Sequence, residues 1–156
     1  MLEVAQRMSE STRELFASMM GLRAEEGPSI DLLETDARME IVALVGLSGG
    51  SVGVVGVYSS GALARHIAGA LLGSTPTAVD DEVRDAFGEV ANIIAGNVAT
   101  FLGDRGETIQ LSLPTVIVGT SLVTSILNTV PPRRATRFSV DGEDLYVEMA
   151  RRRDEV

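Results

Sequence analysis

Cysteine and lysine are both absent from the sequence, and histidine occurs once, at His66. Without cysteine there is no disulfide framework, thiol nucleophile or zinc–thiolate site, and the composition suits a reducing cytoplasm. Without lysine, a P-loop phosphate site and a Schiff-base enzyme are excluded. With a single histidine, a metal site built from several histidines is excluded, and a Ser–His–Asp triad would have to use His66. We therefore expect a cytoplasmic protein whose chemistry uses other side chains.

Charge and hydropathy argue against two further classes of protein, nucleic-acid-binding proteins and membrane proteins. The 13 basic residues, all arginine, are outnumbered by 22 acidic ones, and the net charge of −9 argues against nucleic-acid binding. Stretches 41–64 and 108–132 each run for more than 20 residues without a charge, which is long enough for a membrane span. Both are interrupted, by SGGS and by Pro114, and both are rich in Val, Ile, Ser and Thr. They therefore predict paired strands and no membrane insertion.

The patterning predicts an α+β fold in which an antiparallel sheet packs with long helices. We expect a single domain over residues 1–150 and a short charged tail over 151–156. Met8, Met19 and Met20, on an amphipathic N-terminal helix, are interpreted as core filling rather than as a binding surface. The predicted helices are 2–22, 61–72 between Ser60 as N-cap and Gly73, and a long helix ending near 102. Residues 28–36 are interpreted as an edge strand or an extended connection. Hairpin turns are predicted at SGGS, residues 48–51, and at Asp141-Gly142. The other predicted strands are 39–47, 52–59, 108–113, 116–119, 121–129, 137–140 and 145–149.

The stretch DAFGEVANIIAGNVAT, residues 85–100, divides into two faces when it is read as a helix. Apolar residues at 3- and 4-residue spacing predict a face against the core. Asp85, Glu89 and Asn92 follow one another at i, i+4 and i+7 and form a polar stripe on the opposite face, which Gly96 and Thr100 continue. The predicted core face contains Val83, Phe87, Val90, Ala91, Ile94, Val98 and Phe101.

Two glycines, Gly88 and Gly96, border this polar stripe. Glycine inside a helix costs about 1 kcal/mol relative to alanine. Their presence predicts that another surface comes close there. The acidic residues 80–82 just before the stripe are interpreted as the favourable start of a helix rather than as a metal site.

Three interpretations of the polar stripe remain open from the residues themselves. It can be a solvated helix face, an interaction surface without chemistry, or a catalytic site. In the catalytic case an amide is too weak a base to take a proton, so Asn92 would orient a water molecule while Glu89 pairs with a cation. Phosphate and Mg²⁺ would then have to come from the partner.

The same residues carry a resemblance to the CheC/CheX/FliY phosphatases of bacterial chemotaxis. The family pattern is Asp or Ser, three residues, Glu, two residues, Asn, and a proline about twenty residues later. Here Asp85, Glu89, Asn92 and Pro114 match it. The surroundings also resemble the family: Gly88 before the Glu, IIAGN after the Asn, and SLPT around the proline. The resemblance covers nearly the whole chain.

The resemblance implies dephosphorylation of the phospho-aspartate of a CheY-like response regulator. It implies that Glu89 contacts the regulator's conserved lysine and that Asn92 orients the attacking water. Asp85, Gly88 and Gly96 would contact the partner. The regulator would supply the Mg²⁺, so no metal or cofactor is expected on this chain.

The resemblance further implies a single-site, CheX-type homodimer. CheC and FliY carry two copies of the motif, whereas the N-terminal helix here has Ala17 where a second Asn would follow Glu14. The alternative to a phosphatase is a non-catalytic dimer that binds or scaffolds a response regulator. A structural component of the flagellar switch is a third interpretation, in which the acid–amide pair would have no purpose.

Overall fold

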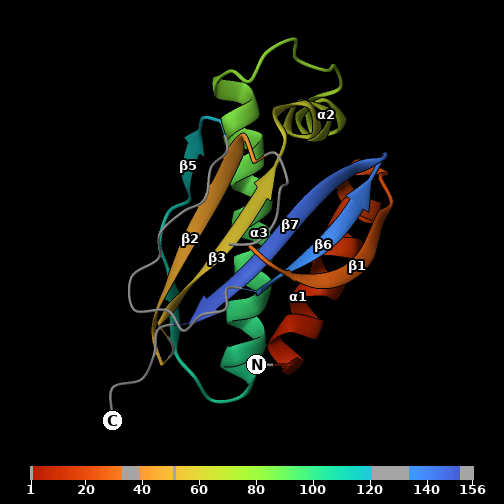
Figure 1. Cartoon of the computed structure of the whole chain (residues 1–156). Coiled ribbons are helices and arrows are strands. Elements are labelled where there is room, and N and C mark those ends of the chain that lie inside the picture. The colour runs from red at the N-terminus through yellow and green to blue at the C-terminus, as the bar shows by residue number, and fades with distance from the viewer. Residues whose placement is uncertain (1, 33–38, 51, 121–133, 152–156) are drawn as a thin grey trace.

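A seven-stranded antiparallel sheet, covered on one face by helices, forms the protein in a computed structural model that describes residues 2–32, 39–50, 52–120 and 134–151 (Figure 1). The predicted α+β class is confirmed. The elements, in chain order, are α1 (Leu2–Leu15), η1 (Phe16–Met20), β1 (Ala24–Asp31), β2 (Ile41–Gly49), β3 (Gly53–Ser59), α2 (Gly61–Leu72), α3 (Asp81–Asp104), β4 (Ile109–Leu111), β5 (Thr115–Val118), β6 (Arg134–Val140) and β7 (Glu143–Arg151).

Two hairpins supply the middle of the sheet, and both follow the predicted turns. β2 and β3 pair from Ile41 opposite Ser59 to Leu47 opposite Gly53. β6 and β7 meet at Asp141 and Gly142, which both have positive φ, as a tight hairpin turn requires. β3 pairs with β7, so the strand order is β1-β6-β7-β3-β2-β4, with β5 also paired to β2. β1 therefore lies at one edge, in agreement with the edge-strand interpretation, but it begins four residues before the predicted stretch 28–36, of which residues 33–36 lie outside the described ranges.

The helices α1 and α3 lie behind the sheet in Figure 1, and α2 lies at one end of it. The main core fills the space between α1, α3 and the inner face of the sheet. Its fully buried side chains include Phe16, Phe87, Ile94, Phe138 and Leu145. This core holds α3 along its length, which matters because α3 carries the polar stripe.

A smaller cluster lies on the other face of the sheet and includes Leu32, Met39 and Tyr146. In it the Tyr58 hydroxyl donates a hydrogen bond of 2.8 Å to Glu148 Oε1, and both side chains are buried. Burial of a carboxylate requires such partners. Both sheet faces therefore carry buried side chains, rather than only the one beneath the helices.

The N-terminal helix differs from its prediction in one respect. Its α-helical part ends at Leu15, and a π-helical turn, η1, follows before Gly21 closes it with φ of 64°. A π turn is closed by hydrogen bonds between residues five rather than four apart, so the side chains that follow it are shifted around the helix axis. Met20 is buried, whereas Met19, which lies four residues after the buried Leu15, is 52% exposed. The core-filling interpretation is correct for Met8 and Met20 and wrong for Met19.

The other predicted elements agree closely with the structure. α2 has the predicted bounds, and the Ser60 hydroxyl accepts the Leu63 N–H at its start. α3 extends two residues beyond the predicted end at 102, to Asp104. Strands β4 and β5 are separated by Pro114, as expected. The predicted strand 121–129 and most of the charged tail lie outside the described residues.

Candidate functional site

The candidate site lies on α3, a helix that is capped at its N-terminus and packed against the core. Asp80 caps the helix, because its Oδ1 accepts the Val83 N–H at 3.0 Å, and Asp81 and Glu82 occupy the first turn. This supports the interpretation of the acidic run as a helix start, where the helix dipole favours negative charge. The core face of α3 is buried as predicted, except that Phe101 is only partly buried. Its other six residues are at most 1% exposed: Val83, Phe87, Val90, Ala91, Ile94 and Val98.

The polar stripe lies on the opposite side of α3. Asp85 and Glu89 are exposed and Asn92 is partly exposed. Residues three and four apart on a helix have Cβ atoms about 5–6 Å apart, so these side chains can act on one bound group. Within the part of the chain that the structure describes, none of the three makes a side-chain hydrogen bond or an ion pair. The stripe is thus a set of polar groups free to bind something else.

A second asparagine on the same helix behaves differently. Asn97 donates a hydrogen bond from Nδ2 to Ser11 Oγ at 2.6 Å, which ties α3 to α1. The Asn97 amide, although the residue is exposed, is engaged in this hydrogen bond between two helices, whereas the Asn92 amide has no such partner among the described residues. The contrast separates a structural amide from one available to a partner.

The two bordering glycines have different surroundings. Gly88 is buried, and a Cβ built on it would lie 3.1 Å from Val116 Cγ2 and 3.6 Å from Pro114. The surface that comes close at Gly88 is therefore β5 and its preceding loop in the same chain, rather than a partner, because no room is left there. At Gly96 a Cβ would meet nothing within 4 Å. That side of the stripe is open.

The loop before β5 brings Pro114 beside the stripe. Ser112 anchors this loop to β2: its hydroxyl accepts the Gly46 N–H at 2.8 Å and donates to the Leu113 carbonyl at 3.0 Å. The Ser112 N–H also donates to the Gly46 carbonyl at 2.9 Å. Pro114 is in this way held next to Gly88, and Asn92 lies one helical turn after Gly88 on α3.

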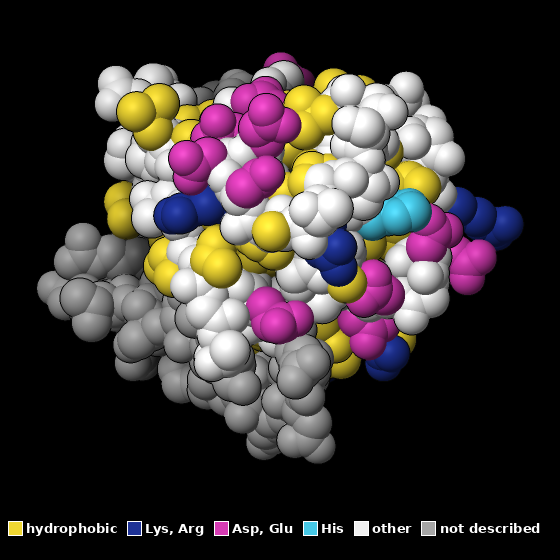
Figure 2. Space-filling model, turned by 90° about the horizontal axis from the view of Figure 1, so that it is seen from above, with side chains coloured by type: hydrophobic (Ala, Val, Ile, Leu, Met, Phe, Trp, Pro, Cys, Tyr) yellow, Lys and Arg dark blue, Asp and Glu magenta, His cyan; other side chains and the backbone are white. Residues whose placement is uncertain are grey.

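An apolar groove borders the other side of the stripe, and sequence reasoning did not anticipate it. It has a volume of about 440 Å³ between η1, α2 and α3. Asp85 and Glu89 belong to both the groove and the stripe. Figure 2 looks onto this end of the molecule, where acidic side chains gather next to hydrophobic ones. The lining residues are Leu15, Met19, Met20, Leu71, Leu72, Glu82, Asp85, Ala86, Glu89, Val90 and Ile93.

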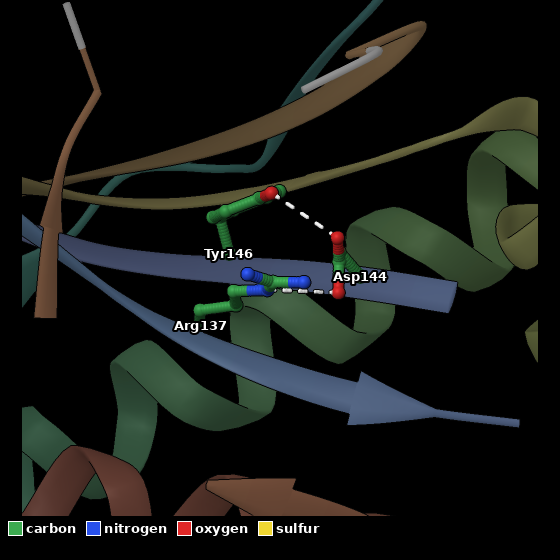
Figure 3. A network of polar contacts seen from close by, with 3 residues as sticks. All are labelled: Arg137, Asp144 and Tyr146. Carbon is green, nitrogen blue, oxygen red and sulfur yellow. Dashed lines mark hydrogen bonds and ion pairs between the residues drawn. The ribbon is translucent and has the colours of Figure 1, made fainter. Parts of the chain in front are cut away.

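Polar contacts elsewhere serve the fold. On the β6–β7 hairpin, Arg137 Nε donates to Asp144 Oδ1 at 2.9 Å and the Tyr146 hydroxyl lies 3.4 Å from Asp144 Oδ2 (Figure 3). The hydrogen bond and the negative charge of Asp144 raise the pKa of Arg137. His66 Nε2 lies 2.7 Å from Asp141 Oδ2, which joins α2 to the hairpin turn.

The acidic side chains form no metal centre in the described ranges, which contain no group of three or more His, Asp or Glu side chains able to hold a metal ion. α3 is long and apolar enough to cross a membrane by length and composition alone. Its apolar face is the one packed under the sheet, as expected of the core helix of a folded domain.

Comparison with known proteins decides the family. The sequence matches the family described as "Chemotaxis phosphatase CheX" over residues 41–130, more than half of the chain. This chain belongs to the CheX family. The matched region includes all of α3, the polar stripe and Pro114, so the predicted resemblance is confirmed.

A curated relative and two solved structures extend the similarity over nearly the whole chain. The CheY-P phosphatase CheX of Thermotoga maritima is 24% identical over 141 residues, which cover 89% of this chain and 90% of that protein. A CheC-like superfamily protein from Shewanella sp. PV-4 superposes with a TM-score of 0.86 at 21% identity, covering 98% of this chain and 99% of that one. The CheX–CheY–BeF₃–Mg²⁺ complex from Borrelia burgdorferi gives a TM-score of 0.81 at 24% identity, covering 95% and 97%. These structures share the fold described above.

Proposed function

We propose that this protein is a phosphatase that hydrolyses the phospho-aspartate of a CheY-like response regulator. The observation that carries the proposal is the pair Glu89 and Asn92, three residues apart on α3 and without side-chain partners in the described structure. Membership of the CheX family supports it. So does the Thermotoga maritima relative, which is named a CheY-P phosphatase.

The chemistry assigns a separate role to each residue. A water molecule attacks the phosphorus, the bond between phosphorus and the aspartate oxygen breaks, and the products are inorganic phosphate and a free carboxylate. Asn92 holds the water in line for this attack, because an amide can donate and accept hydrogen bonds but is too weak a base to remove a proton. Glu89 forms an ion pair with the regulator's lysine and thereby fixes the two proteins in register.

Mg²⁺ is expected on the regulator rather than on this chain. The Borrelia burgdorferi complex contains CheY, BeF₃ and Mg²⁺ together with CheX. Phosphoryl transfer needs positive charge close to the phosphoryl oxygens. This chain has no lysine, and Arg84 is the only basic residue on α3. The partner therefore provides the phosphoryl group and the positive charge, and this chain provides the oriented water.

We further propose that the protein acts in the cytoplasm as a homodimer, without membrane insertion or nucleic-acid binding. Exposed apolar side chains on and beside β4 and β5 support association between copies, since such a patch along strands is costly to leave in water. They are Leu111, Leu113, Ile117 and Val118, with Leu113 87% exposed. Sedimentation of the purified chain measures the state directly.

The same exposed patch favours the second candidate function, a dimer that binds or scaffolds a response regulator without hydrolysis. The deciding experiment measures the decay of phosphorylated response regulators from the source genome, with Mg²⁺ present. Faster decay of at least one regulator with the wild type, and not with a Glu89→Ala, Asn92→Ala double variant, supports the phosphatase. Binding without faster decay supports the scaffold. Neither binding nor decay contradicts both.

A further inference from the structure

The apolar groove beside Glu89 has the properties of a binding pocket. Met19 of η1 and Leu72 of α2 are 52% and 49% exposed, and both line it. Exposed apolar side chains that gather in one groove mark a surface suited to binding a partner. Met19 is also flexible and polarisable, which suits a surface that adapts to a partner. The groove therefore offers apolar area that a partner would cover.

The backbone beneath Met19 is unusual. A run of five residues, Phe16–Met20, is π-helical, and Gly21 ends it in the left-handed region. π turns are rare and are found frequently at functional sites. Within this turn Phe16 and Met20 are buried, whereas Met19, which the helical spacing assigned to the core, is exposed at the groove. The local geometry thus creates the apolar wall next to the polar stripe.

The charge at the groove selects the kind of partner. Its edge carries three acids, Glu82, Asp85 and Glu89, and none of the described lining residues is basic. A partner surface that fits it carries an apolar side chain flanked by positive charge. Glu89 is shared between the groove and the proposed catalytic pair, and Asn92 is three residues further along the same helix. A protein docked on that pair consequently also lies over the groove.

We propose that the groove binds an apolar side chain that the response regulator presents next to the lysine contacted by Glu89. The inference rests on the proposed function and adds a specificity determinant to it. Glu89 and Asn92 recognise features that all such regulators share, whereas an apolar anchor in a groove distinguishes one regulator from another. The groove therefore contributes to binding, and it does not contact the reacting phosphoryl group.

The test uses neutral variants that keep side-chain size. Met19→Gln and Leu72→Asn make the groove polar without adding charge to its acidic edge. Val52→Thr is the matched control, because Val52 is similarly exposed, at 43%, in the β2–β3 turn. Unfolding temperatures of all variants verify the fold. For each, kcat and KM are measured with the phosphorylated regulator that the wild type dephosphorylates, and Kd with its BeF₃–Mg²⁺ form.

We expect Met19→Gln and Leu72→Asn each to raise KM and Kd about tenfold, with kcat changed by less than about twofold. Met19→Leu is expected to retain wild-type values, as is Val52→Thr. Unchanged KM and Kd for both groove variants, with an active wild type, would overturn the inference while leaving the phosphatase intact. A wild type that neither hydrolyses nor binds any regulator would overturn the proposed function itself. Conversion of a dimer to a monomer by Met19→Gln would instead identify the groove as a contact between copies and contradict the inference.

Discussion

Gly88 of α3 and Val116 of β5 are so close that a Cβ built at Gly88 would lie 3.1 Å from Val116 Cγ2. This contact sets the separation between the helix that bears Glu89 and Asn92 and the strand that follows Pro114. Any larger residue at 88 must push the two apart or displace Val116. The position of the proposed catalytic pair relative to its flanking loop therefore depends on a residue without a side chain.

Replacing Gly88 and Gly96 of α3 by alanine separates helix propensity from this contact. Gly96→Ala is expected to stabilise the protein by about 1 kcal/mol, because alanine is favoured in helices and nothing lies within 4 Å of the new Cβ. Gly88→Ala gains the same propensity but must displace Val116, so we expect its free energy of unfolding to be about 1–3 kcal/mol below that of Gly96→Ala. Denaturant unfolding measures both. Equal stabilities would contradict the tight contact at Gly88.

Removal of the free amide tests its role in catalysis. Asn92→Ala is expected to lower kcat for regulator dephosphorylation by about 100-fold or more, because the attacking water is no longer held in line. The fold is expected to be retained, since Asn92 has no hydrogen-bond partner among the described residues. Stopped-flow or radiolabel decay of the phosphorylated regulator provides the measurement.

Asn97→Ala is the matched control for this prediction. It removes the hydrogen bond to Ser11 and is expected to cost about 1 kcal/mol of stability while leaving kcat near the wild-type value. A reversed pattern, with Asn97→Ala inactive and Asn92→Ala active, would locate the site one to two turns further along α3.

Neutralising the exposed glutamate tests the proposed ion pair with the regulator. Glu89→Gln keeps the size of the side chain and removes its charge. We therefore expect the Kd for the BeF₃–Mg²⁺ form of the regulator to rise about tenfold. Binding by the wild type should also weaken with added salt more steeply than binding by the variant. Titration at two ionic strengths measures this. Asp104→Asn, an exposed acid at the other end of α3, is the control and should leave the Kd unchanged.

Chelation of Mg²⁺ distinguishes a metal on the regulator from a metal on this chain. With EDTA, dephosphorylation is expected to stop, because the phosphoryl group loses its neutralising cation. The unfolding temperature of this protein alone should not change, since its described residues contain no metal-binding group of acids and histidine. A drop in that temperature on chelation would indicate a structural metal instead.

Much of the fold could be predicted because it depends on local patterns. Ser60 and Gly73 mark the ends of α2, and Asp141-Gly142 marks the last hairpin, because caps and tight turns need particular side chains or positive φ. The two faces of α3 follow from the helical repeat, which places Phe87 inside and Glu89 outside whatever surrounds the helix. The acid–amide motif was visible for the same reason.

The exposure of Met19 could not be predicted from the sequence. Nor could the identity of the residues that pack against Gly88. The helical repeat assigned Met19 to the core, but residues 16–20 form a π turn in which Phe16 and Met20 are buried and Met19 is exposed. The cost of two helical glycines predicted a close surface. Only the pairing of β5 with β2 shows that this surface at Gly88 belongs to the chain itself.

The sequence by itself determined which residues form α3, which of its faces is buried and which three polar side chains lie together outside, because these follow from local spacing. The tertiary structure decided what flanks them: Pro114 and Val116 on one side, and the groove of η1 and α2 on the other. Those neighbours come from other elements, η1 and α2 before the motif and the segment around β5 after it. Their positions are set by sheet pairing and core packing, and no local pattern encodes them.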